Sequence, residues 1–378
     1  MTSATIQPRQ LESLLPGFHM VGSERHRKLF GQGCMHGAYN ANVIVQCDLE
    51  TDTWGPVFEI PKDGERTPLF SLELVDTSPW YPLYSMQSYG DGDYFFYIYW
   101  RCDIRGTNEK YTHYLCRYSV ADNESQVIAP VDFGRFCVSE NGTYIAARSD
   151  RDIYIYDLQH GRRRKLELDT DLYDDIIYWH GDSTLVRSGK NGSETRIEQY
   201  DVEFNMRIDD GLQRLKGDER FQARYRTALT PSGDAVFANY DRCVVVDKQG
   251  EQKKTVKFTE SFDDPEGYPH ATVEPFDVRI TKDGTYALIL WTIHLNFLVA
   301  AVVNLQTGAF AEAKLADADC NHLNTLSYTV MDDCRTLYAF AENGHINIYE
   351  LSELFIEGQP QDANTQFNAW GDWLDGLE

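Results

Sequence analysis

Short apolar runs alternate with tight turns along most of this chain. The stretch SENGTYIAARSDRDIYIYDLQHG, residues 139–161, holds a turn pair, an apolar run, a charged turn, a second apolar run and a final turn. The pair Asn141-Gly142 is a strong hairpin signal, because both residue types tolerate a positive φ. The pattern therefore predicts short β-strands joined by tight turns rather than helices.

The same order of strands and turns recurs along the chain. Clear copies begin at Ala228, Val278 and Tyr328, with first turns at Ser232-Gly233, Asp283-Gly284 and Asp333-Cys334. Weaker copies turn at Gly92 and Gly181, and a seventh unit fits residues 30–61. Successive turns lie roughly 40 to 50 residues apart, and a period of that length with four short strands per unit is typical of a β-propeller.

The repeat predicts an all-β fold, a seven-bladed β-propeller of four-stranded antiparallel blades that spans residues 30–355. One twisted four-stranded sheet cannot bury both its faces, but a ring of such sheets covers every face and leaves only short edges. No convincing helical period separates the strands, which argues against a parallel α/β sheet. A pair of β-sandwiches is the competing interpretation, because the spacing of short strands alone does not exclude it.

The pattern S-x-x-G-x-Y-x-A followed by I-Y-I-Y-D-L-x-x-G, within residues 139–161, resembles the blades of WD40-like and TolB-like propellers. The resemblance follows the period over roughly residues 30–355. The chain departs from true WD40 repeats because no blade opens with Gly-His and no strand ends in Trp-Asp; positions 156–157 read Tyr-Asp. The resemblance implies a rigid platform for binding other proteins, which is what propellers of this sort frequently provide.

The two ends of the chain fall outside the repeat. Residues 1–29 form an N-terminal extension, and closing a ring generally needs one strand from the far end of the chain. The segment GFHMVGS, residues 17–23, is expected to supply the outer strand of the last blade, after a short helical turn in PRQLESLL. Residues 356–378 form an acidic tail that carries several aromatic residues.

Charge limits the partners that the chain can bind. With 59 acidic and 35 basic side chains, the formal net charge is −24, which repels phosphate backbones and argues against nucleic acid as a partner. The same charge attracts a basic protein partner, although acidity also serves solubility alone. No apolar run approaches the length of a membrane span, so no membrane partner is expected. The eight cysteines lie far apart and favour a reducing cytoplasm.

Candidate binding residues lie in long aromatic segments. Residues 61–86 and 258–276 are longer than usual connections, and long loops on a rigid scaffold often carry binding. The candidates for partner binding are Trp80, Tyr81, Tyr84 and Tyr268 in these loops, with Trp370, Trp373 and Leu374 in the tail. The alternative for each segment is that it packs over its own propeller.

No motif points to a metal or a cofactor, and none is expected. The acidic stretch DTDLYDD, residues 169–175, lacks the EF-hand pattern and is interpreted as a solvated loop. The histidines are scattered; His180 and His294 are interpreted as structural. The basic cluster GRRRK, residues 161–165, is expected on the rim of the ring, paired with the chain's own carboxylates.

Two functions fit these observations. The first is a non-catalytic interaction scaffold, in one form an acidic inhibitor or immunity-type protein that binds a basic partner. The second is an enzyme at the mouth of the central channel, such as a lactonase-like or other hydrolase with a divalent metal. The expected innermost strands, among them RFCVS and DVRIT, are poor in acids and imidazoles, which favours the first function.

Overall fold

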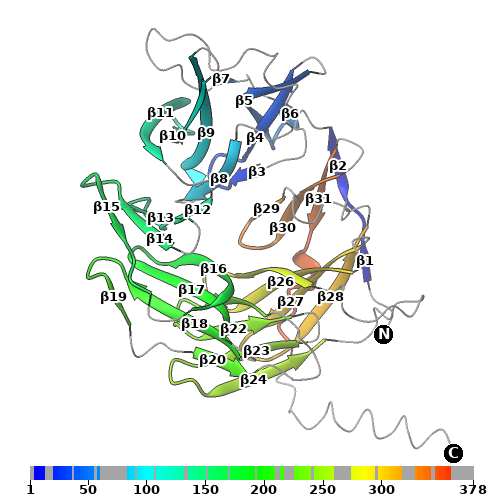
Figure 1. Cartoon of the computed structure of the whole chain (residues 1–378). Coiled ribbons are helices and arrows are strands. Elements are labelled where there is room, and N and C mark those ends of the chain that lie inside the picture. Colours follow the sequence, from blue (N-terminus) through cyan, green and yellow to red (C-terminus); the bar gives the residue numbers. More distant parts are fainter. Residues whose placement is uncertain are drawn as a thin grey trace, which may run out of the picture.

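The computed structural model describes residues 4–12, 20–35, 38–54, 58–59, 83–89, 92–105, 108–131, 135–149, 152–168, 171–191, 194–208, 213–216, 225–239, 242–258, 274–293, 297–316, 328–341 and 345–358. These residues form seven sheets arranged as a ring (Figure 1). Each sheet contains an antiparallel blade of four strands, which are named A, B, C and D from the centre outward. The predicted seven-bladed all-β propeller is confirmed.

The first four blades follow one another along the chain. Blade 1 contains β3 (Met20–Ser23), β4 (Lys28–Met35), β5 (Ala38–Asp48) and β6 (Thr53–Trp54), with β7 (Phe58–Glu59) also paired to β5. Blade 2 contains β8 (Leu83–Tyr89), β9 (Tyr94–Arg105), β10 (Asn108–Ser119) and β11 (Glu124–Val131). Blade 3 contains β12 (Arg135–Val138), β13 (Tyr144–Ser149), β14 (Asp152–Asp157) and β15 (Arg162–Lys165). Blade 4 contains β16 (Tyr173–His180), β17 (Thr184–Asn191), β18 (Glu194–Asp201) and β19 (Met206–Arg207), with β20 (Gln213–Lys216) also paired to β18.

The last three blades include strands from the N-terminus. Blade 5 contains β21 (Arg226–Leu229), β22 (Ala235–Ala238), β23 (Arg242–Val246) and β24 (Gln252–Lys257). Blade 6 contains β25 (Glu274–Ile280), β26 (Tyr286–Ile293), β27 (Phe297–Asn304) and β28 (Phe310–Leu315), with β1 (Ala4–Ile6) parallel to β28. Blade 7 contains β29 (Tyr328–Met331), β30 (Thr336–Phe340), β31 (His345–Glu350) and β2 (Arg9–Glu12), and the short helix η4 (Ser352–Leu354) follows β31.

The N-terminal segment closes the ring, but not through the expected residues. The outer strand of blade 7 is β2, which pairs antiparallel with β31, where a helical turn was expected. The segment expected in that place contains β3, and β3 is instead the innermost strand of blade 1. The prediction for residues 17–23 is therefore wrong. Trp54 Nε1 donates to the Glu12 carbonyl at 2.7 Å, and Arg9 forms an ion pair with Asp52, so the closing strand is also tied to blade 1.

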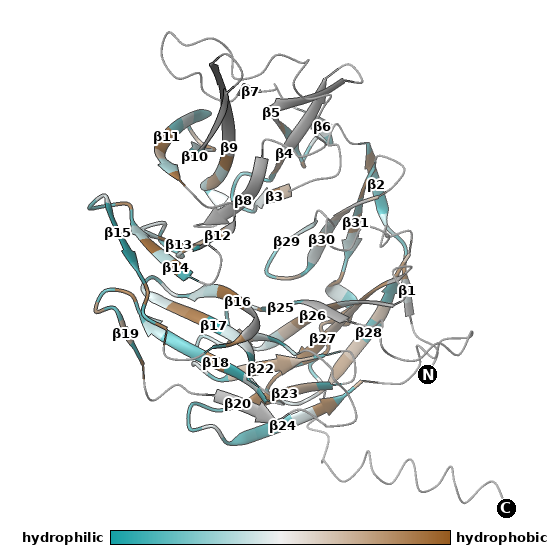
Figure 2. Cartoon of the chain, in the orientation of Figure 1, coloured by the Kyte–Doolittle hydropathy of each residue, from teal (hydrophilic) through white to brown (hydrophobic). Residues whose placement is uncertain are grey.

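Each pair of neighbouring blades shares one cluster of buried apolar side chains. Seven clusters fill the seven interfaces, and the one between blades 7 and 1 includes Leu11 and Met20 from the N-terminal strands. Figure 2 shows apolar segments along β22 and β27, two of the strands that supply these clusters. The thiol of Cys243 is buried in one cluster, and burial raises its pKa to about 12, as expected of a cysteine that acts as a small apolar residue.

Turns between A and B strands bend through a residue in the left-handed region. In six blades the residue is one that the sequence pattern singled out: Gly92, Gly142, Gly181, Gly233, Gly284 and Cys334, with φ between 70° and 86°. Glycine fits this conformation without steric cost. At Gly92 a Cβ atom would lie 2.4 Å from the Ser23 Cα of blade 1, so neighbouring turns approach each other closely.

Turns between C and D strands are shaped by one polar side chain at the end of the C strand. Asp157 Oδ1 accepts hydrogen bonds from the backbone N–H groups of Gln159 and His160, at 3.1 and 3.0 Å. The same Asx-turn geometry recurs at Asp48, Asp201, Asp247 and Asn304. This is the position at which WD40 strands carry the Asp of Trp-Asp, and sequence reasoning recognised it only at position 157.

These turn carboxylates predict a loss of stability in acid. Hydrogen bonds from the backbone of Thr51 and Glu50 hold the pKa of Asp48 below its usual range, and the Thr281 hydroxyl does the same for Asp283. Such a group stabilises the fold above its unfolded pKa, and this contribution is lost as the pH falls through the lower folded pKa. Stability in urea is therefore expected to fall from about pH 5 to pH 3.

The variant Asp48→Asn/Asp283→Asn is expected to keep both turns, since Asn304 fills the position of Asp48 in blade 6 and Asn141 fills that of Asp283 in blade 3. Its stability is expected to depend less on pH over the same range, because an amide does not titrate. Urea denaturation at several pH values measures the slope. A slope identical to that of the unmodified protein would contradict the assignment.

Candidate interaction face

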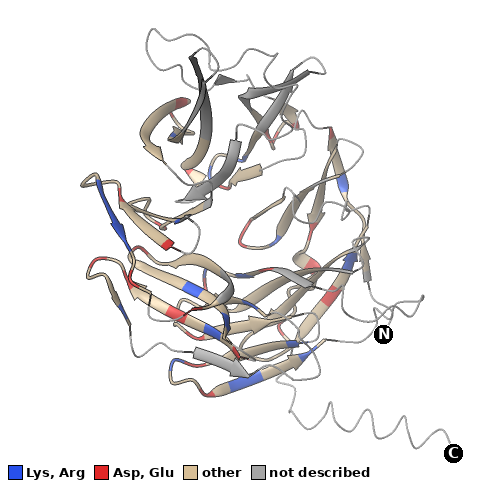
Figure 3. Ribbon diagram, viewed as in Figure 1, with Lys and Arg blue, Asp and Glu red and all other residues tan. Residues whose placement is uncertain are grey.

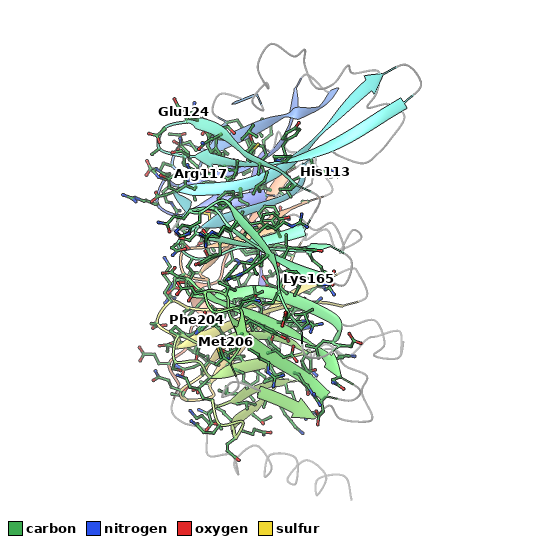
Figure 4. The ribbon with its side chains drawn as sticks, turned by 60° about the vertical axis from the view of Figure 1, so that its left-hand side comes forward. His113, Arg117, Glu124, Lys165, Phe204 and Met206 are labelled. Carbon is green, nitrogen blue, oxygen red and sulfur yellow. The ribbon has the colours of Figure 1, made fainter. Side chains whose placement is uncertain are left out.

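The A–B and C–D turns of each blade lie on the same side of the ring, here called the turn face. In six blades the backbone N–H of the residue that follows the C-strand end donates to a carbonyl of the A–B turn, or of the residue just after it. Examples are Leu49 to Arg27 at 2.8 Å and Val202 to Ser183 at 3.0 Å. In these six blades the two turns are therefore joined to each other. The long strands β9 and β10 extend beyond the other blades on the side of the ring opposite the turn face (Figure 4).

Carboxylates outnumber basic groups on this face among the described residues. The exposed acidic side chains at or next to these turns are Glu50, Asp52, Asp122, Glu124, Glu140, Asp182, Glu203, Glu251, Asp283, Glu350 and Glu353. The exposed basic ones are Arg9, Arg25, Arg162, Lys248, Lys253, Lys282 and Arg335, of which Arg9 and Lys253 pair with Asp52 and Asp234 of these turns. The acidic excess of the whole chain is thus present on the turn face, where it creates an electrostatic potential that attracts cations.

Polar contacts join several A–B turns to one another. Lys282 Nζ pairs with Glu24 Oε2 at 3.2 Å, and its backbone N–H donates to Asp333 Oδ1 at 2.8 Å. Arg25 pairs with Asp93 at 2.6 Å. Burial on its own raises the pKa of Asp93, but hydrogen bonds from His26 and Arg25 outweigh it and lower that pKa. These contacts link blades 1, 2, 6 and 7 and make the turn face a rigid surface.

Two large apolar side chains project from the turn face at blade 4. Phe204 is 73% exposed and Met206 is 57% exposed, more than any other large apolar residue in the described part of the chain. Both lie in or just after the C–D turn between β18 and β19, and Figure 4 shows them at the edge of the ring. Exposed large apolar side chains that lie together often mark a protein-binding site.

The turn that carries Phe204 is held in place by its own backbone. Asp201 Oδ1 accepts hydrogen bonds from the N–H groups of Glu203 and Phe204, at 2.9 and 3.2 Å. Arg164 of blade 3 donates to the Glu203 carbonyl at 3.3 Å, and Asn205 has a φ of 54°. The phenyl ring is therefore presented by an ordered turn.

Carboxylates of blades 3 and 4 lie near this apolar pair. Burial raises the pKa of the Tyr144 hydroxyl in blade 3, and the negative charges of Glu203 and Asp157 raise it further. The Tyr144 ring stacks on Trp179, with centroids 6.0 Å apart. The exposed Asp182 lies in the A–B turn of the same blade as Phe204. The exposed apolar pair thus has Glu203, Asp182 and Asp157 in its neighbourhood, together with Arg164 at the Glu203 carbonyl.

A second polar cluster lies on the innermost strands, toward the centre of the ring. Asp277 Oδ2 on β25 accepts a hydrogen bond from Arg279 Nε at 2.8 Å and another from the Tyr328 hydroxyl on β29 at 2.8 Å. Burial, followed by the charge of Asp277, raises the pKa of Tyr328. A phenol with a raised pKa stays protonated near neutral pH, and the hydrogen bond that it donates to Asp277 joins blades 6 and 7. The sequence analysis did not identify these residues, because it counted the acids and imidazoles of the innermost strands as a group and did not consider single side chains of DVRIT.

The aromatic candidates from the sequence are not brought together by the described structure. Tyr84 lies in β8, the innermost strand of blade 2, and nothing is described of its side chain. The others lie outside the described residues: Trp80, Tyr81, Tyr268, Trp370, Trp373 and Leu374. Their roles stay predictions. The sequence analysis did not identify Phe204 and Met206. A Phe or Met in a repeat of short strands is interpreted as a buried core residue unless the position of the turn is known.

The basic cluster predicted on the rim is found there. Arg162–Lys165 form β15, the outermost strand of blade 3, and Figure 3 shows its basic residues. Lys165 pairs with Asp152 at 2.7 Å, and the Arg163 guanidinium lies 4.1 Å from the ring centroid of Tyr154. Pairing within the chain is thus confirmed for Lys165.

In the described part of the chain, no group of three or more His, Cys, Asp or Glu side chains could hold a metal ion. In the acidic stretch 169–175, which was interpreted as a loop, Asp171 is exposed. The residues from Tyr173 onward belong to strand β16. His180 is half-buried, and burial lowers its pKa. None of the helices in the described ranges is long and apolar enough to cross a membrane.

Comparison with known proteins identifies the fold. No protein-family model matches the sequence, and no curated protein is significantly similar to it. A chain in the structure of the mitotic checkpoint complex is similar, with a TM-score of 0.56, 9% identity and 92% of each chain covered. U3-55K is similar with a TM-score of 0.56 and 10% identity, over 91% of this chain and 98% of that chain. Hydrazine synthase from Kuenenia stuttgartiensis is similar with a TM-score of 0.54 and 11% identity, over 89% of this chain and 96% of that chain.

The first two of these structures are WD40 propellers. The resemblance of the blade pattern to WD40-like propellers is therefore confirmed at the level of the fold. Identities this low show the arrangement of the chain alone, because one fold hosts many unrelated functions.

Proposed function

We propose that this protein is a non-catalytic interaction scaffold whose turn face binds a basic protein partner. The observation that carries the proposal is the excess of exposed carboxylates on a rigid surface that also presents Phe204 and Met206. One specific form is the neutralisation of a basic partner, such as a toxin or a nuclease, by an acidic inhibitor. Complementary charge speeds such an encounter and selects against acidic proteins.

The architecture supports a scaffold. Seven interface clusters and the contacts between turns fix the turn face. Binding of a partner therefore costs little conformational entropy on this face. The one cluster described on the innermost strands, Asp277 with Arg279 and Tyr328, has its carboxylate already paired. The WD40 structures similar to this chain include one from a multi-protein complex.

A charge-reversal experiment tests the proposal. The tagged full chain is used to recover partners from a native lysate at about 0.1 M and 0.5 M salt, because charge attraction is screened within a few ångströms at high salt. The expected partner is a basic protein whose recovery falls at high salt. Its recovery is expected to fall at least about tenfold with Asp182→Lys/Glu203→Lys, since both changes repel a cation.

A matched control carries the same charge change elsewhere. Glu167 and Asp171 are exposed and lie between β15 and β16, in a D–A connection on the other face of the ring. The variant Glu167→Lys/Asp171→Lys is expected to keep the partner. Equal losses in the two variants, or the absence of any salt-sensitive basic partner, would count against the proposal.

A further inference from the structure

Phe204 occupies a position that is polar or glycine in every other blade. It is the third residue after the C-strand end, Asp201. The equivalent residues, counted from Asp48, Ser119, Asp157, Asp247, Asn304 and Glu350, are Thr51, Asp122, His160, Gly250, Thr307 and Glu353. All seven positions follow the same strand end, so the difference does not come from the fold. The turn of blade 4 gains no packing from its phenyl ring, because the residue is 73% exposed.

Met206 adds to this apolar surface. It begins β19, two residues after Phe204, and it is 57% exposed. Methionine is flexible and polarizable, and it suits binding surfaces that adapt to an apolar group. The other large apolar residues exposed in the described part of the chain are Val127 and Ile356, at 36% and 39%, and they belong to other parts of the ring. Blade 4 thus carries the main exposed apolar patch of the described surface.

The charges around the patch define what it fits. Asp182 and Glu203 are exposed; Glu203 directly precedes Phe204, and the A–B turn that carries Asp182 is tied to the same turn by the Val202 N–H, which donates to the Ser183 carbonyl at 3.0 Å. Arg164, which donates to the Glu203 carbonyl, is a basic group at this turn. Burial on its own raises the pKa of Asp157 nearby, but hydrogen bonds from His160 outweigh it and lower that pKa, so this carboxylate is ionised at neutral pH. An apolar group that docks on Phe204 and Met206 therefore has carboxylates at its border, which favours a ligand with cations on either side of the apolar group.

We propose that the blade 4 turn, with Phe204 and Met206, is the anchor point for a cationic protein segment that carries a large apolar side chain between Lys or Arg residues. This inference rests on the proposed function and adds which residues provide the main contact. Binding energy in interfaces is concentrated in a few aromatic and large apolar anchors, with charges around them. The acidic border steers the segment, and the apolar pair holds it.

Two synthetic peptides test the inference on the full chain. One is a twelve-residue peptide with a Phe and two Leu among Lys and Arg residues, and the other replaces these three by Ser at the same charge. Fluorescence anisotropy at about 0.1 M salt gives the ratio of their dissociation constants. The unmodified protein is expected to bind the apolar peptide at least about tenfold more tightly, the factor that 1.4 kcal/mol provides.

The variant Phe204→Ser/Met206→Ser is expected to bind both peptides with nearly equal affinity, because only the apolar contact is removed. Both side chains are exposed, so its melting temperature should stay unchanged. The matched control Val127→Ser/Ile356→Ser removes the other exposed apolar residues and is expected to keep the full ratio.

The outcomes separate the anchor from the acidic face. A ratio that survives Phe204→Ser/Met206→Ser, or that falls equally in the control, overturns the anchor. If Asp182→Asn/Glu203→Gln then still weakens both peptides, the acidic face stands without it. If the unmodified protein binds neither peptide, or if the charge variant changes nothing, the proposed function fails as well.

Discussion

Deleting residues 1–12 is expected to destabilise the whole ring. The deletion removes β2 from the edge of β31 and takes Leu11, which is 4% exposed, out of the cluster between blades 7 and 1. Loss of a buried leucine side chain alone costs about 2–5 kcal/mol. For a chain of this length, a loss near the upper end lowers the melting temperature by roughly 5–10 °C.

The truncated protein is also expected to associate, because an uncovered strand edge pairs with other chains. Thermal melting and size-exclusion chromatography measure the two effects. Deletion of residues 1–3 is the control and should leave both unchanged, since β1 begins at Ala4. A truncated chain that melts within a degree of the full chain would show that β2 does not close the ring.

Replacing Arg187 by methionine is expected to cost about 3–5 kcal/mol, the range for breaking a buried ion pair. Arg187 and Glu198 are cross-strand partners on β17 and β18. Their side chains are 4% and 0% exposed, with Nη1 and Oε2 3.3 Å apart. The Tyr200 hydroxyl also donates to Glu198, at 2.8 Å. The single change leaves a buried carboxylate without its guanidinium.

The double variant Arg187→Met/Glu198→Met separates charge from packing. It is expected to be clearly more stable than Arg187→Met, because two apolar side chains of similar size replace a buried pair at little cost. Urea denaturation of the unmodified protein, of Arg187→Met and Glu198→Met, and of the double variant gives the coupling between the two positions. A double variant as unstable as the single one would mean that packing, not the ion pair, dominates at this site.

The fold could be predicted because its repeat is local. A glycine with positive φ, as at Gly142 and Gly284, follows from the turn type alone, and the spacing of these turns revealed seven blades. The C–D turns were equally local but went unused, although Asp48, Asp201 and Asp247 each end a strand in the same way. An alignment of the blades on this strand-end residue would have identified Phe204 as a turn residue.

The closing strand could not be predicted in the same way. The residues Arg9–Glu12 and Met20–Ser23 form short strands with little pattern of their own. Which edge each one joins depends on tertiary contacts, such as the cluster around Leu11 and the bond from Trp54 to Glu12. A short segment such as PRQLESLL can be read as helix or strand from its spacing, and the free edge of β31 decides the outcome.

The ring depends on the register that pairs Glu12 with His345. Opposed residues in antiparallel strands have Cα atoms about 4.5–5.5 Å apart, within the range that a disulfide spans. The variant Glu12→Cys/His345→Cys is therefore expected to form a cross-link between these positions in the folded protein, and not in urea, as mapped by mass spectrometry of the digested chain. Thr5→Cys/His345→Cys, with its first cysteine on blade 6, should not form one. No cross-link at 12 and 345, or equal cross-linking in both variants, would contradict a ring closed by the N-terminal strand.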